Sequence, residues 1–259
     1  MSNDMKSDRR VALITGGNRG IGRGIAIGLA QDGIDIAINY HKNSEEADRT
    51  VSQLAEQGVL ARAYKASVQN YEAVSSMVEK VAADFGQIDV LVNNAGIASR
   101  GKSIANTDPE EFERVVRTHC FGTFYATHAA MPYLRKSNRA DVIMISSAAT
   151  RNYMGYGSPY NAGKAGIEAI AYGLAKEELK NNIKVNIVAP GIVETDMGRR
   201  LVKATRMVED IREIDATSPF GHVCQPEDVA NVVRYLVSTS NSYITGEKIY
   251  VDGLAGAIR

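Results

Sequence analysis

The chain has 259 residues, of which 44% are hydrophobic and 23% charged, a composition that suits one globular domain with a large core. Its 30 basic and 30 acidic residues give a formal net charge of +0 without blocks of like charge, which argues against binding to nucleic acid or an anionic membrane. The polar residues 1–10 lack the apolar core of a signal peptide, and no apolar run reaches membrane-spanning length, so we expect a flexible N-terminal tail and a cytoplasmic protein. Cys120 and Cys224 fit no metal-ligand spacing, so no metal site is expected.

The first unit of the chain reads as a strand, a glycine-rich turn and a helix. The apolar residues 11–15 have strand length, and a helical pattern runs from Ile21 to Ala30. Glycines in the turn between them let the backbone approach a pyrophosphate, and the N-terminus of the helix offers N–H groups to that anion. The pattern therefore predicts a nucleotide-phosphate site at Gly16, Asn18, Arg19, Gly20, Ile21 and Gly22.

Strand-like and helix-like stretches then alternate to the end of the chain. Further strands are expected at 34–39, 60–65, 88–92, 141–147, 183–189 and 248–251, and further helices at 44–57, 71–85, 108–134, 158–180 and 226–237, with Ser44 and Asp108 as N-caps. The alternation predicts one doubly wound α/β domain of the Rossmann type over residues 11–259, with a mostly parallel sheet of about seven strands and helices on both faces. The least regular stretch, 191–223, is too long for an ordinary connection and is interpreted as a substrate lid.

The segment from Ser158 to Lys164 carries a chemical pattern. With Ser158 as N-cap, Tyr160 and Lys164 are four residues apart on one helix and share a face. An ammonium beside a phenol lowers the phenol pKa, which makes Tyr160 a candidate acid or base. Ser147 ends an apolar strand, and the carboxyl ends of strands are where open α/β sheets bind ligands. On its own, however, a Tyr and a Lys at this spacing usually form part of a solvated helix face.

Taken together, the glycine turn and this segment resemble the short-chain dehydrogenases/reductases, in the branch that includes β-ketoacyl-ACP reductases. The resemblance extends from about Val11 to Gly253. It rests on Thr15-Gly-Gly-Asn-Arg-Gly-Ile-Gly22, Asn93-Asn-Ala-Gly96, Ser147, Tyr160-x3-Lys164, Pro190-Gly-Ile-Val-Glu-Thr195, Ile244-Thr-Gly and Val251-Asp-Gly253.

The resemblance implies an NAD(P)-dependent oxidoreductase that interconverts a ketone and a secondary alcohol by hydride transfer. Tyr160 would transfer the proton, Ser147 would position the carbonyl oxygen, and Lys164 would hold the cofactor ribose and keep the tyrosine acidic. Other implied cofactor contacts are Ser67 and Val68 near the adenine, Asn93, Asn94, Ala95 and Gly96 along the adenosine side, and Pro190, Gly191, Val193 and Thr195 near the carboxamide.

The end of the second strand bears on the choice of cofactor. Enzymes of this fold that use NAD place a carboxylate there, against the ribose 2′-OH. Here the strand ends in Tyr40, His41 and Lys42 without a carboxylate, and Arg19 in the glycine turn suits a phosphate. The sequence therefore favours NADP(H) over NAD(H), with Arg19, Tyr40, His41 and Lys42 as candidate contacts.

The chain departs from the family pattern in the middle helix and after the third strand. The family has an Asn whose backbone bends the helix and holds a water of the proton relay, and His119 stands at that position. We expect His119 either to join the relay and make turnover steeply pH-dependent or to be a core residue without a role. The usual Asp near the adenine is replaced by Ser67, which weakens the predicted adenine contact but not the fold.

The substrate is poorly specified by the sequence. β-Ketoacyl-ACP reductases carry basic residues for the acidic carrier protein, and the aligned positions here are Asn138 and Asn181, although Arg135, Lys136, Arg139 and Lys180 lie nearby. A β-ketoacyl thioester on acyl carrier protein or CoA, a sugar, polyol or other ketone substrate, and a catalytically idle nucleotide-binding regulator all stay open. Relatives are often homotetramers, and Phe124, Tyr125 and Met131 suit an interface as well as a core.

Overall fold

The computed structural model describes residues 9–206 and 208–254. Seven strands form one sheet in the order β3-β2-β1-β4-β5-β6-β7, and every neighbouring pair is parallel. The predicted doubly wound α/β fold is therefore confirmed, with the strand order reversing between β1 and β4. The strands are β1 (Val11–Ile14), β2 (Asp35–Tyr40), β3 (Ala61–Lys65), β4 (Val90–Asn93), β5 (Ala140–Ile145), β6 (Ile183–Pro190) and β7 (Lys248–Val251).

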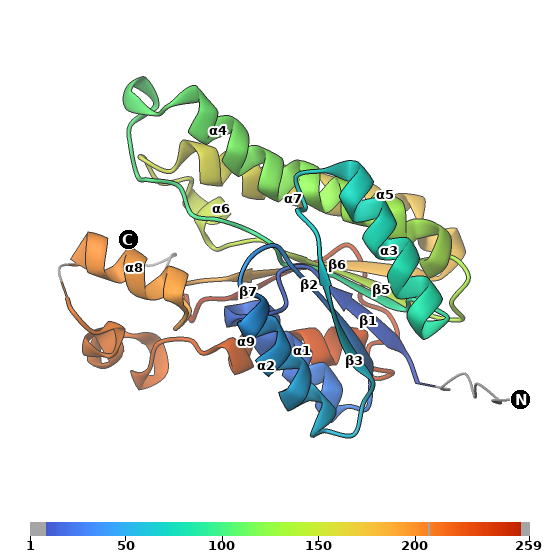
Figure 1. Cartoon of the computed structure of the whole chain (residues 1–259). Coiled ribbons are helices and arrows are strands. Elements are labelled where there is room, and N and C mark those ends of the chain that lie inside the picture. The colour runs from blue at the N-terminus through green and yellow to red at the C-terminus, as the bar shows by residue number, and fades with distance from the viewer. Residues whose placement is uncertain (1–8, 207, 255–259) are drawn as a thin grey trace, which may run out of the picture.

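Helices cover both faces of the sheet (Figure 1). One face packs against α1 (Gly20–Gln31), α2 (Ser44–Ala55) and α9 (Pro226–Val237), and the other against α3 (Tyr71–Phe85), α5 (Gly122–Leu134) and α7 (Ser158–Glu177). Alternate residues of β1 enter the two cores, Leu13 on one side and Ala12 and Ile14 on the other. A strand buried on both faces has to be apolar throughout, which is why these strands read as unbroken hydrophobic runs.

The long helix expected over 108–134 is interrupted. It consists of α4 (Pro109–Val116), a π-helical turn η2 (Arg117–Phe121) and α5. At its start Asp108 caps α4 as expected, accepting a hydrogen bond from the Glu110 backbone N–H. A π-turn inserts a residue into the helical ladder and commonly lies at functional sites. The extra residue changes the direction in which the His119 side chain leaves the helix. Helical periodicity alone did not predict this change.

Two other predicted helix caps are wrong by one residue. Asn43 rather than Ser44 caps α2, and it does so from a left-handed conformation with φ 67°. Gly157 rather than Ser158 is the N-cap of α7, so Ser158 is already the first helical residue. Neither shift changes which face of its helix is buried.

The stretch 191–223 is more regular than expected. It forms α8 (Asp196–Arg206) and the short 3-10 helices η4 (Ile211–Thr217) and η5 (Pro219–Gly221). Val202, Ile211, Ile214 and Val223 give it a small core of its own, separate from the two main ones. The described residues also contain three short helices, η1 (Ile104–Asn106), α6 (Ala149–Asn152) and η3 (Leu179–Asn181).

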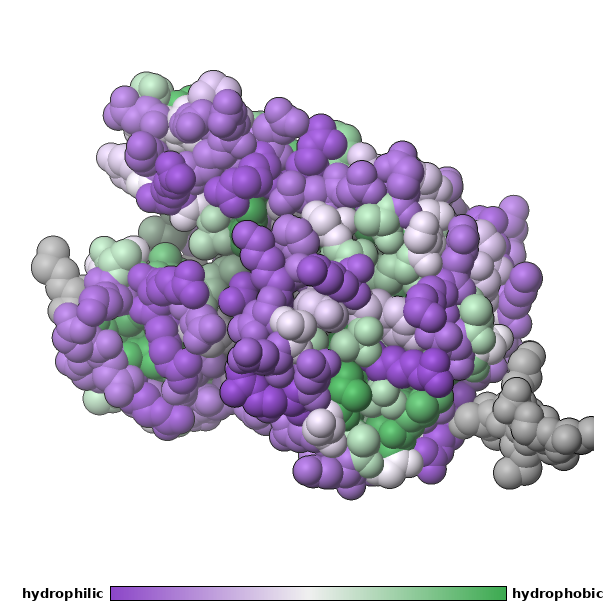
Figure 2. All heavy atoms as spheres, viewed as in Figure 1, coloured by the Kyte–Doolittle hydropathy of each residue, from purple (hydrophilic) through white to green (hydrophobic). Residues whose placement is uncertain are grey.

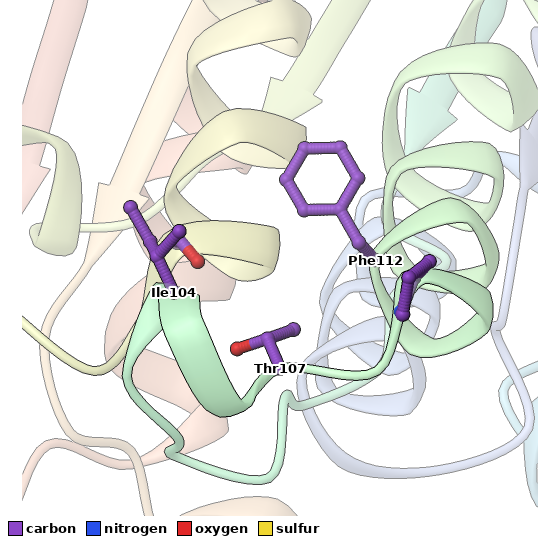
Figure 3. A pocket seen from close by; sticks show the side chains of 5 residues that line it. Ile104, Thr107 and Phe112 are labelled. Atoms are coloured by element: carbon purple, nitrogen blue, oxygen red, sulfur yellow. The ribbon is translucent and has the colours of Figure 1, made fainter.

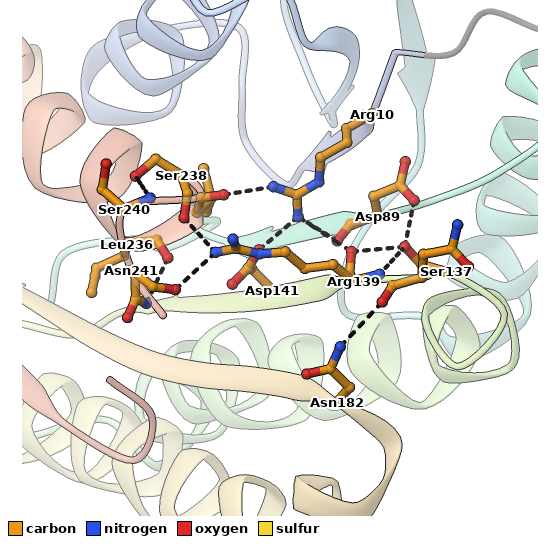
Figure 4. A network of polar contacts seen from close by, with 12 residues as sticks. Arg10, Asp89, Ser137, Arg139, Asp141, Asn182, Leu236, Ser238, Ser240 and Asn241 are labelled. Atoms are coloured by element: carbon orange, nitrogen blue, oxygen red, sulfur yellow. Dashed lines mark hydrogen bonds and ion pairs between the residues drawn. The ribbon is translucent and has the colours of Figure 1, made fainter. Parts of the chain in front are cut away.

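A network of hydrogen bonds and ion pairs joins the amino ends of several strands (Figure 4). The Arg10 guanidinium donates to the Asp141 carboxylate and to the Val237 carbonyl, both at 2.6 Å. Arg139 also reaches Asp141, at 3.4 Å, and Asp89 accepts from the Val11 N–H at 2.7 Å. Arg10 therefore belongs to the folded domain, which corrects the predicted tail of residues 1–10; its residues 1–8 lie outside the described residues.

Asp141→Ala is expected to lower the free energy of unfolding by about 3–5 kcal/mol. The change removes the buried carboxylate that the guanidinium groups of Arg10 and Arg139 share, and it leaves both cations without this partner. Asp141 is 1% exposed. Chemical denaturation would measure the change, with Asp48→Ala on the exposed side of α2 as the control. A loss no larger for Asp141→Ala than for the control would contradict this role.

The residues expected at a subunit interface divide between core and surface. Met131 is buried in the core, Tyr125 is half-buried, and Phe124 is half exposed on α5. The homotetramer stays a prediction, and of these three residues only Phe124 belongs to the exposed surface of the chain.

Over the described residues, no helix is long and apolar enough to cross a membrane, and no group of three or more His, Cys, Asp and Glu side chains is arranged to hold a metal ion.

Candidate active site

The three catalytic candidates meet at the carboxyl edge of the sheet. Ser147 lies just beyond β5, and Tyr160 and Lys164 project from the first turns of α7. The side chains of Ser147 and Tyr160 are hydrogen-bonded to each other. Lys164 is 3% exposed, donates to the Ile145 carbonyl at 2.7 Å, and lies with its ammonium 5.7 Å from the centre of the Tyr160 ring. The fold thus brings together residues that are 17 positions apart in sequence.

Burial governs the acidity of this pair. It raises the pKa of Tyr160 above its usual value, and the hydrogen bond with Ser147 only partly opposes the rise. Burial also lowers the pKa of Lys164 to about 7. The expected lowering of the Tyr160 pKa by Lys164 is therefore wrong for the protein on its own, because removal from water outweighs the neighbouring charge. Tyr160 is protonated at neutral pH, as a proton donor has to be.

His119 lies directly against Tyr160. Its ring is fully buried in the π-turn η2 and meets the Tyr160 ring edge-on, with centres 5.3 Å apart and planes at 83°. Its Nε2 lies 2.8 Å from the Ile97 carbonyl oxygen. Burial, followed by the charge of Lys164, lowers the pKa of His119 to about 3. The imidazole is therefore neutral at physiological pH, and the expected titration of His119 near neutrality is wrong.

Two glycines make room for this histidine. A Cβ atom at Gly96 would lie 2.5 Å from the His119 Cε1, and one at Gly163 would lie 2.9 Å from the His119 Cβ. Both distances are too short for any side chain. Gly96, which was assigned to the cofactor groove, is thus also required for packing against His119, a constraint that sequence reasoning missed.

The glycine turn between β1 and α1 has the shape that a pyrophosphate needs. The Arg19 side chain does not cap α1, which leaves the N–H groups of the first turn without that partner. A Cβ at Gly22 would lie 2.4 Å from the Gly16 carbonyl oxygen, so the turn closes only around glycine. The Asn94 amide braces the turn by donating to the carbonyls of Thr15 at 2.9 Å and Gly16 at 3.1 Å. These features fit a dinucleotide cofactor.

The exposed side chains of Arg19, His41 and Lys42 surround the end of β2, and Tyr40 is half-buried there. Asn18 is buried, and its amide donates to the Lys42 carbonyl at 3.4 Å. The glycine turn and the loop after β2 are thereby joined, which keeps the three basic side chains at one end of the sheet.

Asn39 is a positioning residue that sequence reasoning missed. It is 2% exposed, accepts from the Gly16 N–H at 3.3 Å and donates to the Ala66 carbonyl at 3.0 Å. One side chain thus joins the ends of β1, β2 and β3. An asparagine at the last buried position of a strand was the available signal, since a buried amide has to find several partners.

Some predicted cofactor positions are buried or have their polar side-chain atoms hydrogen-bonded within the chain. Val68 is buried against Gly122 of α5, and Asn93 is buried with its amide donating to Thr127 Oγ1 at 3.0 Å. The Thr195 hydroxyl accepts from the Gly198 N–H at 3.1 Å at the start of α8. Among the rest, Ser67, Ala95 and Gly191 are partly exposed, Ile21 is half-buried, and Pro190 and Val193 are buried. Gly20 lies beside Thr195, because a Cβ there would be 3.2 Å from the Thr195 Cγ2.

A family model described as enoyl-(acyl carrier protein) reductase matches residues 16–253. The 3-oxoacyl-(acyl-carrier-protein) reductase FabG of Staphylococcus aureus is 34% identical over 247 residues, 93% of this chain and 96% of the relative. The 3alpha-hydroxysteroid dehydrogenase of Mediterraneibacter gnavus is 34% identical over 254 residues, 97% of this chain and 98% of that one.

The chain belongs to the short-chain dehydrogenase/reductase family. It is therefore an oxidoreductase of a family that binds nicotinamide cofactors. Among solved structures, levodione reductase superposes with a TM-score of 0.90 at 26% identity, covering 96% of this chain and 98% of that one. NAD+-bound xylitol dehydrogenase superposes with a TM-score of 0.87 at 27% identity, covering 94% and 98%. Because these short-chain dehydrogenases/reductases differ in their named substrates, family membership alone does not select one.

Proposed function

We propose that the protein is an NADP(H)-dependent reductase of ketones, which uses Tyr160 as the proton donor. The observation that carries this proposal is the hydrogen-bonded pair of hydroxyls, Ser147 and Tyr160, beside the buried Lys164. When bound, the nicotinamide supplies the hydride that reduces the carbonyl carbon. Ser147 and Tyr160 would both hold the carbonyl oxygen, where negative charge develops, and the Tyr160 proton would neutralise it.

Lys164 and His119 would serve Tyr160 in different ways. Lys164, in its charged form, stabilises the phenolate that is left after proton transfer and would hold the ribose hydroxyls. His119, neutral and wedged between Gly96 and Gly163, fixes the orientation of the Tyr160 ring by its edge-on contact. A proton relay through the imidazolium is not part of this proposal, because the pKa of His119 is about 3.

The glycine turn would hold the pyrophosphate, and Arg19, His41 and Lys42 a 2′-phosphate. On this basis Arg19→Ala is expected to raise the KM for NADPH by about 10- to 100-fold, the loss typical of one charge-assisted hydrogen bond. The KM for NADH should change little. Initial rates with both cofactors test this, with Lys176→Ala on the exposed side of α7 as the control. A parent enzyme that prefers NADH would overturn the choice of NADP(H).

Apolar side chains around the site favour a substrate with an apolar body. Tyr153, Met154 and Tyr156 stand between Ser147 and Tyr160 in the sequence, and Met154 is 70% exposed. Leu254 and Phe220, which is 89% exposed, lie on two neighbouring segments. The segment of Leu254 contacts the one before Tyr153, because Arg151 pairs with Asp252 at 3.2 Å. It also contacts the segment of Phe220, because Gly253 lies against Pro219. We call Tyr153, Met154, Tyr156, Phe220 and Leu254 the apolar rim. Figure 2 shows hydrophobic residues gathered in a hollow between the lobes of α4 and α8.

The apolar rim also has unusual backbone geometry. Tyr153, Tyr156, Phe220 and Leu254 all have positive φ, between 48° and 63°. Such conformations cost energy for bulky residues and cluster at ligand sites.

A second apolar hollow, of about 300 Å³, lies at the first turn of α7 between Ile104, Thr107, Pro109, Phe112 and Ser158 (Figure 3). The segment 191–223, which has its own small core, is proposed as the lid over the substrate.

An acyl carrier protein finds less support than a free ketone. Of the four basic residues near Asn138 and Asn181, Arg135 is paired with Glu178 and Arg139 with Asp141 within the chain. NADPH oxidation with an acetoacetyl thioester, an apolar cyclic ketone and a ketose would separate the alternatives. We expect the highest kcat/KM with an apolar ketone. A preference for the ketose would make the protein a sugar or polyol enzyme, and no turnover of any carbonyl would favour a nucleotide-binding regulator.

A further inference from the structure

A buried carboxylate lies behind the catalytic residues. Glu168 is on α7, four residues after Lys164, and is 7% exposed. Its Oε1 accepts hydrogen bonds from Ser146 Oγ and Thr150 Oγ1, both at 2.6 Å. Its Oε2 pairs with Lys248 of β7 at 2.9 Å. A carboxylate is costly to bury unless it is paired and fully hydrogen-bonded, and each oxygen of Glu168 has such partners.

The two hydroxyls that Glu168 binds lie on either side of the catalytic serine. Ser146 directly precedes Ser147, and Thr150 is in α6, which begins two residues after it. The Thr150 hydroxyl also lies 2.8 Å from the Ser147 carbonyl oxygen. Ser146 and Thr150 are themselves buried, so neither is available to a substrate in the cleft. Glu168 therefore joins the segment that carries Ser147 to the helix that carries Tyr160 and Lys164.

We propose that Glu168 is a positioning residue that holds the Ser147 hydroxyl in register with Tyr160 through Ser146 and Thr150. The inference rests on the proposed function, because it assumes that Ser147 and Tyr160 act on the same carbonyl oxygen. Lys248, whose ammonium lies 2.9 Å from Glu168 Oε2, places a positive charge beside this buried carboxylate. Glu168 itself does not touch the substrate, so it acts on catalysis through the residues around it. Its hydrogen bonds hold the segment of Ser147, and its charge acts on Lys164, a second route that the neutral Glu168→Gln removes while keeping an acceptor for the hydroxyls.

A double-mutant cycle with Ser147 tests this route. Glu168→Ala is expected to lower kcat by about 100-fold, the order of loss that follows when a reacting group is misplaced by an ångström. In the Ser147→Ala background the same change should lower kcat by about twofold or less, because the hydroxyl that Glu168 positions is already gone. A purely structural role would cost a similar factor in both backgrounds. Equal losses, or an unchanged kcat in folded Glu168→Ala, would overturn the inference.

Matched variants separate positioning from general destabilisation. Glu168→Gln keeps an acceptor oxygen for the two hydroxyls and should retain most of the parent kcat. Glu178→Gln alters a second buried, ion-paired carboxylate at the end of the same helix, far along the chain from Ser147, and should leave kcat unchanged. A comparable loss in Glu178→Gln would show that the effect of Glu168→Ala is destabilisation.

If Glu168→Ala does not fold, Thr150→Val removes one of the two hydroxyls at nearly constant volume and should show the same dependence on Ser147. Circular dichroism and thermal unfolding would establish that each variant is folded. A parent protein without any carbonyl reductase activity would mean that the proposed function has failed. An active parent with additive losses would mean that the role of Glu168 alone has failed.

Discussion

Replacement of Tyr160 by Phe is expected to lower kcat for ketone reduction by about 10²- to 10⁴-fold, the range that a positioned general acid contributes. The Phe ring retains the edge-on contact with His119 and the volume in the cleft, and it loses only the hydroxyl that is hydrogen-bonded to Ser147. Because burial raises the pKa of Tyr160, the phenol is in its protonated form over the whole neutral range. The proton that the alkoxide needs is then missing in the variant at every pH.

Single-turnover measurement of NADPH oxidation would isolate this step from product release. Cofactor affinity, followed by the fluorescence of bound NADPH, should stay close to that of the parent. Tyr243→Phe provides the matched control, since Tyr243 is an exposed tyrosine in the turn before β7. A Phe variant at position 160 that reduces ketones at the parent rate would remove the basis of the proposed function.

The second large effect concerns Lys164 and the dependence of stability on pH. Burial lowers the pKa of Lys164 to about 7, from an ordinary value of 10.5, and the charge of Glu168 opposes this only in part. Between these two pH values the unfolded chain keeps the lysine proton and the folded chain releases it. The unfolded state thus binds more protons, so the parent gains stability as the pH rises from 7 toward 10.5, and the full cost of the buried charge is present below pH 7.

Lys164→Met removes this dependence. Relative to the parent, the free energy of unfolding of the variant is expected to fall by on the order of 5 kcal/mol as the pH rises from 7 to 10.5, because one pKa unit corresponds to about 1.4 kcal/mol. Denaturant unfolding at a series of pH values would measure the difference. Lys176→Met, an exposed position on the same helix, should show no such trend. A pH-independent difference between parent and Lys164→Met would show that Lys164 titrates normally.

The two predictions together describe a site in which a buried charge lowers the stability of the fold and serves the proposed reaction. Lys164 is almost fully buried, and its ammonium donates to the Ile145 carbonyl at the end of β5. A methionine would pack in this place without the cost of removing a charge from water. A buried lysine is useful if a negative charge forms nearby during turnover, and in the proposed mechanism that charge is the phenolate left by Tyr160.

Much of the fold follows from local pattern. Strands that are buried on both faces have to be apolar throughout, and the runs around Leu13, Leu91 and Ile143 mark three of them directly. The glycine turn was predictable because a tight turn needs glycine: a Cβ atom at Gly22 would lie 2.4 Å from the Gly16 carbonyl oxygen, and Gly16 has a φ of 63°. The pairing of Tyr160 with Lys164 followed from helical spacing. In each case the cause acts between residues that are close in the sequence, so a local sequence pattern is enough to predict the structure.

The remainder depended on segments far apart in the chain. Sequence alone determined a doubly wound α/β domain and the family to which the chain belongs, and it predicted the phosphate-binding turn and the catalytic candidates Ser147, Tyr160 and Lys164. The tertiary structure decided that a π-turn directs His119 against Tyr160, that burial sets the acidity of Tyr160, His119 and Lys164, and that Asn39 and Glu168 each join several elements. Desolvation and buried hydrogen bonds depend on every neighbour that excludes water from a group, and those neighbours are assembled only when the sheet and its helices pack.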